Sequence, residues 1–297
     1  GVMDRLRLGY DELRTLNPRL VYAAVSGFGQ TGPYRERAAV DAVAQAEGGT
    51  MWLNGEAGGP PMRVGVSIGD MVGGLYLALG VLGALRRRDS TGAGGMVDVS
   101  LMEAQMALCE NAVVRASALG EEPTRMGSRH PLVAPFGPFA TADGWMVVAN
   151  VKDWELFCAL LGHDEMGFDA RFATNETRLV NVEALEKALE EALRRRTTAE
   201  WLDVLLPADC GAFGRVNAIR DLFDDPQVVA REALMEVGLP GGRGSVLTPA
   251  SPMRMEGMVR GRAAVPGLGE DTDSVLASWA GFAEDEITGL RERGAIA

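Results

Sequence analysis

The stretch VGVSIGDMVGGLYLALGVLGALRRR, residues 64–88, is the segment from which the fold can be inferred. A loop rich in glycine and proline, residues 54–61, precedes it, and an apolar run extends from Met71 to Leu85. An acidic residue before this run and three arginines after it predict a helix from about Asp70 to Arg88. The uncharged run is shorter than the roughly 20 residues that a helix needs to cross a bilayer. We therefore expect no membrane span.

The segments around this helix alternate between strand and helix patterns. Short apolar runs at residues 20–26 and 97–99 predict buried strands. Helices are predicted at residues 4–16, 39–47 and 101–118, the last opened by a Ser100–Glu103 capping box. This alternation favours an α/β layer with a Rossmann-like sheet. Further along, a strand is predicted at residues 145–151, helices at 153–162, 182–196, 199–206, 226–234, 272–280 and 284–293, and short strands at 245–248 and 253–258.

Composition narrows the functional class. The chain has 297 residues, 29 basic and 41 acidic side chains and a net charge of −12, so it lacks the basic excess typical of nucleic-acid binders. Its 3 cysteines lie far apart and it has only 2 histidines, so neither a disulfide framework nor a metal centre is expected. We expect no signal peptide at the start of the chain. We expect a cytoplasmic protein that binds neither nucleic acid nor metal.

Two motifs suggest other chemistries. Gly27-x-Gly29-x-x-Gly32 matches the dinucleotide fingerprint, but the predicted helix starts too late for its amide groups to meet a pyrophosphate. Residues 65–69, GVSIG, match the nucleophile elbow of serine hydrolases and would make Ser67 the nucleophile. The prolines at residues 60 and 61 leave little room for the strand that such an elbow requires. A structural glycine turn is the expected role of the first motif and a packed turn that of the second.

Asp70 is the third candidate, and the residues alone leave its role open. It is the only acid between Glu56 and Asp89, and it begins a helix that contains several glycines. Aspartate is a frequent helix cap, which gives a purely structural interpretation. The same position suits a nucleophile, because a helix N-terminus stabilises a carboxylate and glycines let a bulky ligand approach the backbone.

The sequence around Asp70 resembles the class III CoA-transferases, the family of formyl-CoA transferase and crotonobetaine CoA-transferase. The resemblance covers the whole chain. Its most specific part is VGVSIGDMVGG at residues 64–74, followed by LRRR at 85–88 and GMVDVSL at 95–101. Other matching stretches are GVMDRL at 1–6, NPRLVY at 17–22, SGFGQTGPY at 26–34 and GLGEDT at 267–272.

The resemblance implies a CoA transfer from an acyl-CoA thioester to a free carboxylic acid. Asp70 matches the nucleophile, which forms first an aspartyl anhydride and then an aspartyl-CoA thioester. No permanently bound cofactor is implied, because coenzyme A enters as a thioester substrate. Arg5 matches a residue at the CoA phosphates, where a guanidinium suits the charge. The remaining matches to the CoA pocket are Leu6, Ala38, Ala39, Val40, Asp41 and Leu101.

Val40 separates this chain from two branches of the superfamily. The α-methylacyl-CoA racemases have a histidine directly before the acid that matches Asp41, so a two-base racemisation lacks a partner here. Formyl-CoA-type transferases have a tyrosine there, and their long glycine loop has no counterpart in residues 120–145. We therefore expect a transferase rather than a racemase-like isomerase. A small carboxylic acid with a donor such as succinyl-CoA is a better expectation than oxalate or formate.

The resemblance also implies an interlocked homodimer and three parts to the chain. Residues 1–120 would be the remainder of the large CoA-binding domain, 121–225 a small α+β domain with linkers, and 226–297 a return to the large domain. Residues 126–138, with Arg129 and His130 as polar contacts, would add to the active-site pocket. The family has a further segment before the position of Gly1, so we expect this chain to lack its N-terminal part and to be weakly active or inactive alone.

Overall fold

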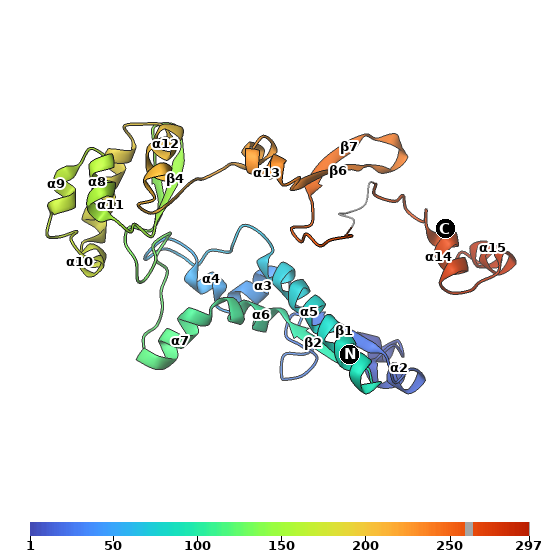
Figure 1. The fold of residues 1–297 in the computed structure, drawn as a ribbon. Coiled ribbons are helices and arrows are strands. Elements are labelled where there is room, and N and C mark those ends of the chain that lie inside the picture. The colour runs from blue at the N-terminus through green and yellow to red at the C-terminus, as the bar shows by residue number, and fades with distance from the viewer. Residues whose placement is uncertain (259–263, 297) are drawn as a thin grey trace. The chain divides into compact units, whose positions relative to one another are not determined.

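Two parallel strands organise the first 120 residues of the computed structural model, which describes residues 1–258 and 264–296. Strand β1 (Val21–Ser26) pairs with β2 (Gly95–Ser100) over their full lengths, from Val21 opposite Gly95 to Ser26 opposite Ser100. Parallel neighbours need a crossover connection. Here it contains helices α3 (Asp41–Glu47), α4 (Thr50–Leu53) and α5 (Ile68–Thr91), and α5 packs on both strands (Figure 1). The predicted α/β layer is thus present.

Two helices expected as continuous are broken. In place of one helix over residues 4–16, α1 (Val2–Arg5) and α2 (Tyr10–Leu16) flank Arg7, which has a left-handed backbone with φ of 57°. In place of one helix over 101–118, α6 (Leu101–Leu108) and α7 (Glu110–Leu119) meet at Cys109. The Ser100 hydroxyl caps α6 by accepting a hydrogen bond from the Glu103 amide.

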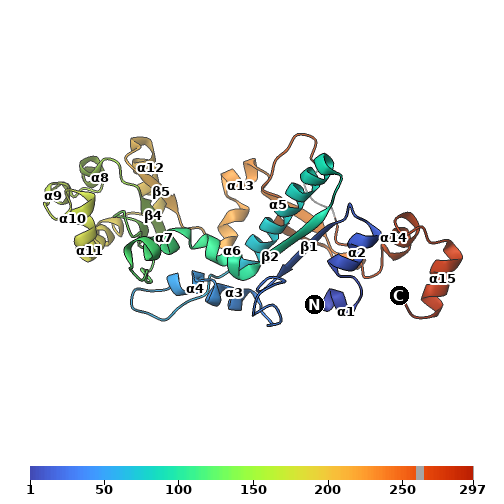
Figure 2. The same ribbon diagram turned by 90° about the horizontal axis from the view of Figure 1, so that it is seen from below.

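Residues 132–215 form a layer of three antiparallel strands and five helices. The strand order is β3 (Gly137–Ala140), β4 (Trp145–Ala149) and β5 (Ala212–Arg215). The helices gather beside this sheet in Figure 2 and are α8 (Trp154–Leu160), α9 (Asp164–Phe168), α10 (Asn175–Val180), α11 (Val182–Leu193) and α12 (Thr198–Ala208). Trp201, Phe157 and Leu189 are among its fully buried side chains, so this layer has its own apolar core.

The structure divides into two compact units, Gly1–Arg215 and Val216–Ala297. In the second unit, β6 (Leu234–Gly238) and β7 (Ser245–Pro249) form an antiparallel hairpin. The strand predicted over residues 253–258 is wrong, because Gly257 has a φ of 76° in a turn there. The helices of this unit are η1 (Ile219–Phe223), α13 (Pro226–Ala230), η2 (Pro240–Gly242), α14 (Thr272–Ser278) and α15 (Glu284–Glu292).

Helix α5 is longer than predicted and is long and apolar enough to cross a membrane, with a mean hydropathy of 1.7 over its most apolar window. Two of its glycines, however, lie in close contact with side chains of the α/β layer. A Cβ on Gly73 would lie 2.4 Å from Leu101 Cδ2, and one on Gly80 would lie 2.5 Å from Val97 Cγ1. Such close contacts with α6 and β2 identify α5 as a core helix of this layer.

Candidate active site

Asp70 lies in the first turn of α5 and is exposed to solvent. Within the part of the chain that the structure describes, its carboxylate takes part in no hydrogen bond or ion pair. The free amide groups and the dipole of the helix N-terminus stabilise negative charge at this position. A carboxylate that is accessible and not engaged by the protein can attack an electrophilic carbonyl.

The space beside Asp70 is open. Gly74 follows it by one helical turn, and a Cβ placed on Gly74 would meet nothing within 4 Å. Gly65, in the loop before α5, is equally free of neighbours. A ligand can therefore approach the helix backbone at Gly74 and the loop backbone at Gly65.

The backbone before Asp70 is fixed from another helix. The amide of Gly69 donates to Asp41 Oδ1 at 2.8 Å, and Asp41 is the first residue of α3. Locally, the amide of Met71 donates to the Ser67 carbonyl at 3.1 Å. Asp41 is only 7% exposed, whereas Asp70 is exposed to solvent. The turn therefore lies between one buried acid and one accessible acid.

The other residues predicted to hold coenzyme A lie in three places. Arg5 and Leu6 are exposed at the end of α1, and the Arg5 guanidinium has no hydrogen-bond partner among the described residues. Ala38 and Val40 are exposed in the loop before α3, whereas Ala39 is half-buried. Two of the predicted residues pack on glycines: Leu101 is 9% exposed and packs on Gly73 of α5, and Ala39 packs on Gly27, whose Cβ would lie 2.2 Å from that of Ala39.

The structure removes the support for the two alternative motifs. No helix begins after Gly32, since the next one is α3 at Asp41, so residues 27–32 cannot present helix amides to a pyrophosphate. Ser67 follows a loop rather than a strand and forms the N-cap of α5 without a side-chain cap hydrogen bond. The strand–turn–helix geometry of a nucleophile elbow is therefore missing.

The cysteines offer no competing nucleophile. Cys109, Cys158 and Cys210 are free and buried. Burial raises the pKa of all three thiols, and that of Cys158 to about 12. A thiol needs its thiolate form to attack, so these side chains are inert at neutral pH.

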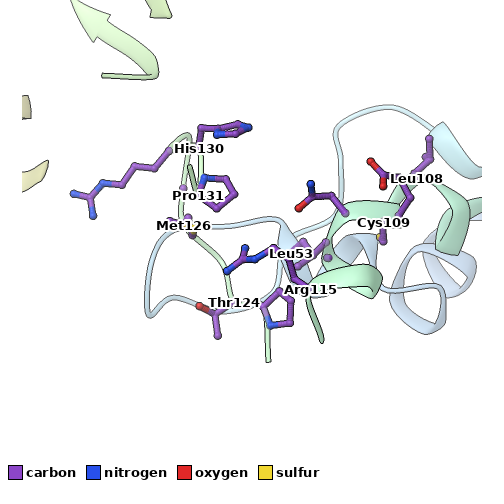
Figure 3. A pocket seen from close by; sticks show the side chains of 14 residues that line it. Leu53, Leu108, Cys109, Arg115, Thr124, Met126, His130 and Pro131 are labelled. Atoms are coloured by element: carbon purple, nitrogen blue, oxygen red, sulfur yellow. The ribbon is translucent and has the colours of Figure 1, made fainter. Parts of the chain in front are cut away.

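A separate cavity of about 400 Å³ lies between α6, α7 and the linker that follows them (Figure 3). Arg129 and His130 line it, as does Cys109, but the residues predicted to bind coenzyme A do not. Arg129 is held by Glu186 through two hydrogen bonds of 2.8 and 2.6 Å, and this pairing raises the pKa of Arg129. His130 Nδ1 accepts from the Leu132 amide at 3.1 Å. Both side chains thus already have protein partners.

Sequence reasoning missed Gln45 and Gln105, which are fully buried against the turn that carries Asp70. Gln45 follows Asp41 by four residues and so lies on the same face of α3. The spacing of Asp41 and Gln45 in a mostly apolar segment was the signal in the sequence that could have identified Gln45.

Comparisons with known proteins define the class. The model of CoA-transferase family III matches residues 1–272, and this chain belongs to that family. The chain is 39% identical to the acetyl-CoA:oxalate CoA-transferase of Acetobacter aceti over 260 residues, which are 86% of this chain and 65% of that enzyme. It is 34% identical to the succinate–glutarate CoA-transferase of Agrobacterium fabrum, covering 91% of this chain and 68% of that one.

A solved structure supports the same assignment. A CAIB/BAIF family protein from Brucella suis superposes with a TM-score of 0.81 and 34% identity, over 93% of this chain and 72% of that protein. The chain thus spans about two thirds of the length of several relatives, including the Acetobacter enzyme at 65%.

Proposed function

We propose that this chain carries the nucleophile of an acyl-CoA:carboxylate CoA-transferase, and that Asp70 is that nucleophile. The observation that carries the proposal is the exposed carboxylate of Asp70, unengaged by described residues, in the first turn of α5. The open position of Gly74 one turn later leaves room for a thioester. Membership of CoA-transferase family III supplies the reaction class.

Four steps move coenzyme A and return the carboxylate unchanged. A carboxylate oxygen of Asp70 attacks the thioester carbonyl, the C–S bond breaks, and the CoA thiolate leaves an acyl-aspartyl anhydride. The thiolate then attacks the aspartyl carbonyl, releases the donor acid and forms an aspartyl-CoA thioester. The acceptor carboxylate attacks this thioester, which gives a second anhydride and free thiolate. Attack of the thiolate on the acceptor's acyl carbon forms the new acyl-CoA and regenerates Asp70.

The predicted CoA-binding residues have separate tasks in this scheme. Arg5 is exposed and has no described partner, so its guanidinium is free to pair with CoA phosphates. Leu6, Ala38, Ala39 and Val40 provide apolar surface for the pantetheine and adenine ends. Leu101 packs against Gly73 of α5 and provides apolar surface to the predicted CoA pocket.

We infer that the acceptor is a small dicarboxylic acid. Relatives are named for oxalate, for mesaconate and for glutarate, and each of these acids carries two carboxyl groups. One carboxylate would react at Asp70 and the other would remain charged. This inference includes oxalate, which the residue at Val40 had made a weaker expectation.

The assembly is also a proposal. We infer an interlocked homodimer, cytoplasmic, with residues 1–120 as CoA-binding layer, 121–225 as small domain and 226–297 as return segment. A racemase would need a histidine at position 40, where this chain has a valine. A serine hydrolase would need a strand before Ser67, where this chain has a loop.

Exchange of isotopic label between an acyl-CoA and its free acid tests the function. We expect weak but measurable exchange with succinate, glutarate or oxalate and at least tenfold less with acetate. Asp70→Asn should abolish it, whereas Ser67→Ala and Asp89→Asn, an exposed acid on the same helix, should retain it. Loss of exchange in Ser67→Ala, or exchange that survives Asp70→Asn, would contradict the proposal.

A further inference from the structure

Three buried polar side chains lie against the turn that leads into Asp70. Asp41 and Gln45 come from α3 and Gln105 comes from α6, and their exposed fractions are 7%, 0% and 0%. Polar side chains are rarely buried this completely unless they satisfy specific hydrogen bonds. Their partners therefore indicate what they do.

Asp41 and Gln45 hold both ends of the loop before α5. Asp41 Oδ1 accepts from the Gly69 amide at 2.8 Å, and Oδ2 accepts from Gln45 Nε2 at 2.7 Å. Gln45 Oε1 in turn accepts from the Val64 amide at 2.9 Å. Gln45 Nε2 also lies 3.4 Å from the Val66 carbonyl oxygen. One continuous network thus fixes the backbone at residues 64, 66 and 69.

Gln105 closes the same turn from the side of α6. Its Oε1 accepts from the Thr50 hydroxyl at 2.5 Å. Its Nε2 is buried, has no hydrogen-bond partner in the described structure, and lies 2.6 Å from the place where a Cβ on Gly69 would be. Gln105 therefore packs directly on the backbone that Asp41 holds.

We propose that Asp41 and Gln45, with Gln105 packed against the same turn, are positioning residues that fix the Asp70 carboxylate for attack. This inference rests on the proposed function. Both oxygens of Asp41 are used within the protein, so its carboxylate orients the nucleophile instead of contacting coenzyme A. Hydrogen bonds from a backbone amide to a buried carboxylate are strong, and small displacements of reacting groups cost large factors in rate.

The pair Asp41 and Gln45 allows a complementary exchange. In Asp41→Asn, the new amide group faces the amide group of Gln45, and one donor is left without an acceptor. In Gln45→Glu, two carboxylates face each other. In the double variant Asp41→Asn/Gln45→Glu, the new amide at position 41 donates to the new carboxylate at position 45. That carboxylate still accepts from the Val64 amide, and the Gly69 amide keeps an acceptor in the amide oxygen at position 41. Only the long contact with the Val66 carbonyl, 3.4 Å in the parent chain, loses its donor.

Steady-state kinetics separate positioning from CoA binding. We expect each single variant to lower kcat by about tenfold or more, with KM for the acyl-CoA changed less than about twofold. The double variant should recover most of the loss. Asp89→Asn, which removes one negative charge as Asp41→Asn does but at an exposed position of α5, serves as the control and should match the parent chain. A rise in KM at constant kcat, or a double variant no better than the singles, would overturn the proposal.

Hydrogen exchange gives a readout that needs no activity. The Gly69 amide should be protected in the parent chain and in the double variant, and should exchange at least tenfold faster in each single variant, measured on the peptide that contains residues 64–70. If the chain shows this pattern but no acyl exchange, the proposed transferase function is contradicted, whereas the hydrogen-bond network is still supported. Equal protection in all four proteins would overturn the network itself.

Discussion

Two adjacent glycines of α5 have opposite surroundings. A Cβ on Gly73 would lie 2.4 Å from Leu101 Cδ2 in the packed layer, whereas a Cβ on Gly74 would meet nothing within 4 Å. The sequence predicted close approach to the backbone somewhere in this run of glycines. It could not separate the two, because the difference comes from α6, a neighbour in space.

Alanine at these two positions should have opposite effects on stability. We expect Gly73→Ala to lower the free energy of unfolding by about 1 kcal/mol, because the buried end of the Leu101 side chain must move away from the added methyl group. Gly74→Ala should raise it by up to about 1 kcal/mol, because alanine favours the helix. Urea denaturation measures both. Gly74→Ala should also slow acyl exchange, since its methyl group enters the space beside Asp70, and undiminished exchange would contradict that use of the space.

The elements that the sequence predicted best are those with strong local signals. Residues 20–26 contain β1, and the apolar run after Asp70 became α5. The break between α1 and α2 was missed because Arg7 takes a left-handed backbone that is unusual for arginine. The hairpin of β6 and β7 was half missed because a helix was expected over residues 226–234, of which α13 takes only the start.

The contact between α3 and α6 depends on Gly48. A Cβ there would lie 2.4 Å from Gln105 Cβ and 2.7 Å from the Met102 carbonyl oxygen. We expect Gly48→Ala to separate the two helices and lower the free energy of unfolding by at least about 1–3 kcal/mol. Gly83→Ala, at an open position of α5, is the matched control and should not destabilise the chain. Equal unfolding midpoints for the two variants would show that α3 and α6 accommodate the added methyl group without loss of stability.

The two layers of the first unit have different cores. The core of residues 132–215 is formed mainly by apolar side chains, with Thr141, Arg178 and Thr198 also buried, whereas the centre of the nucleophile-bearing layer includes Gln45 and Gln105. The hydrophobic pattern predicted β4, α8, α11 and α12 of the first layer, but not β3, β5, α9 or α10. The second depends on hydrogen bonds that join α3 to residues 64–69 and α6 to α4, which no local pattern in a single sequence encodes.

The outer face of α5 contains several strongly exposed apolar side chains. Met71, Leu75 and Leu79 are each 64% exposed, and Leu82 is 62% exposed. Exposed apolar surface of this kind marks a site of further contact. We expect the 297-residue chain to bind the dye ANS, and Leu75→Glu/Leu79→Glu to reduce the fluorescence, whereas Val114→Glu on α7 should reduce it less. The same fluorescence in parent and double variant would mean that this face is covered in solution.

The covalent intermediate on Asp70 is the central claim, and mass spectrometry of the acyl-CoA-treated chain tests it most directly. Cleavage after Arg63 and Arg86 releases a peptide in which Asp70 is the only acidic side chain. We predict that this peptide gains the mass of a CoA thioester, that hydroxylamine removes it, and that Asp70→Asn never acquires it. Acyl exchange without any adduct on this peptide, or an adduct on another peptide that persists in Asp70→Asn, would contradict the account.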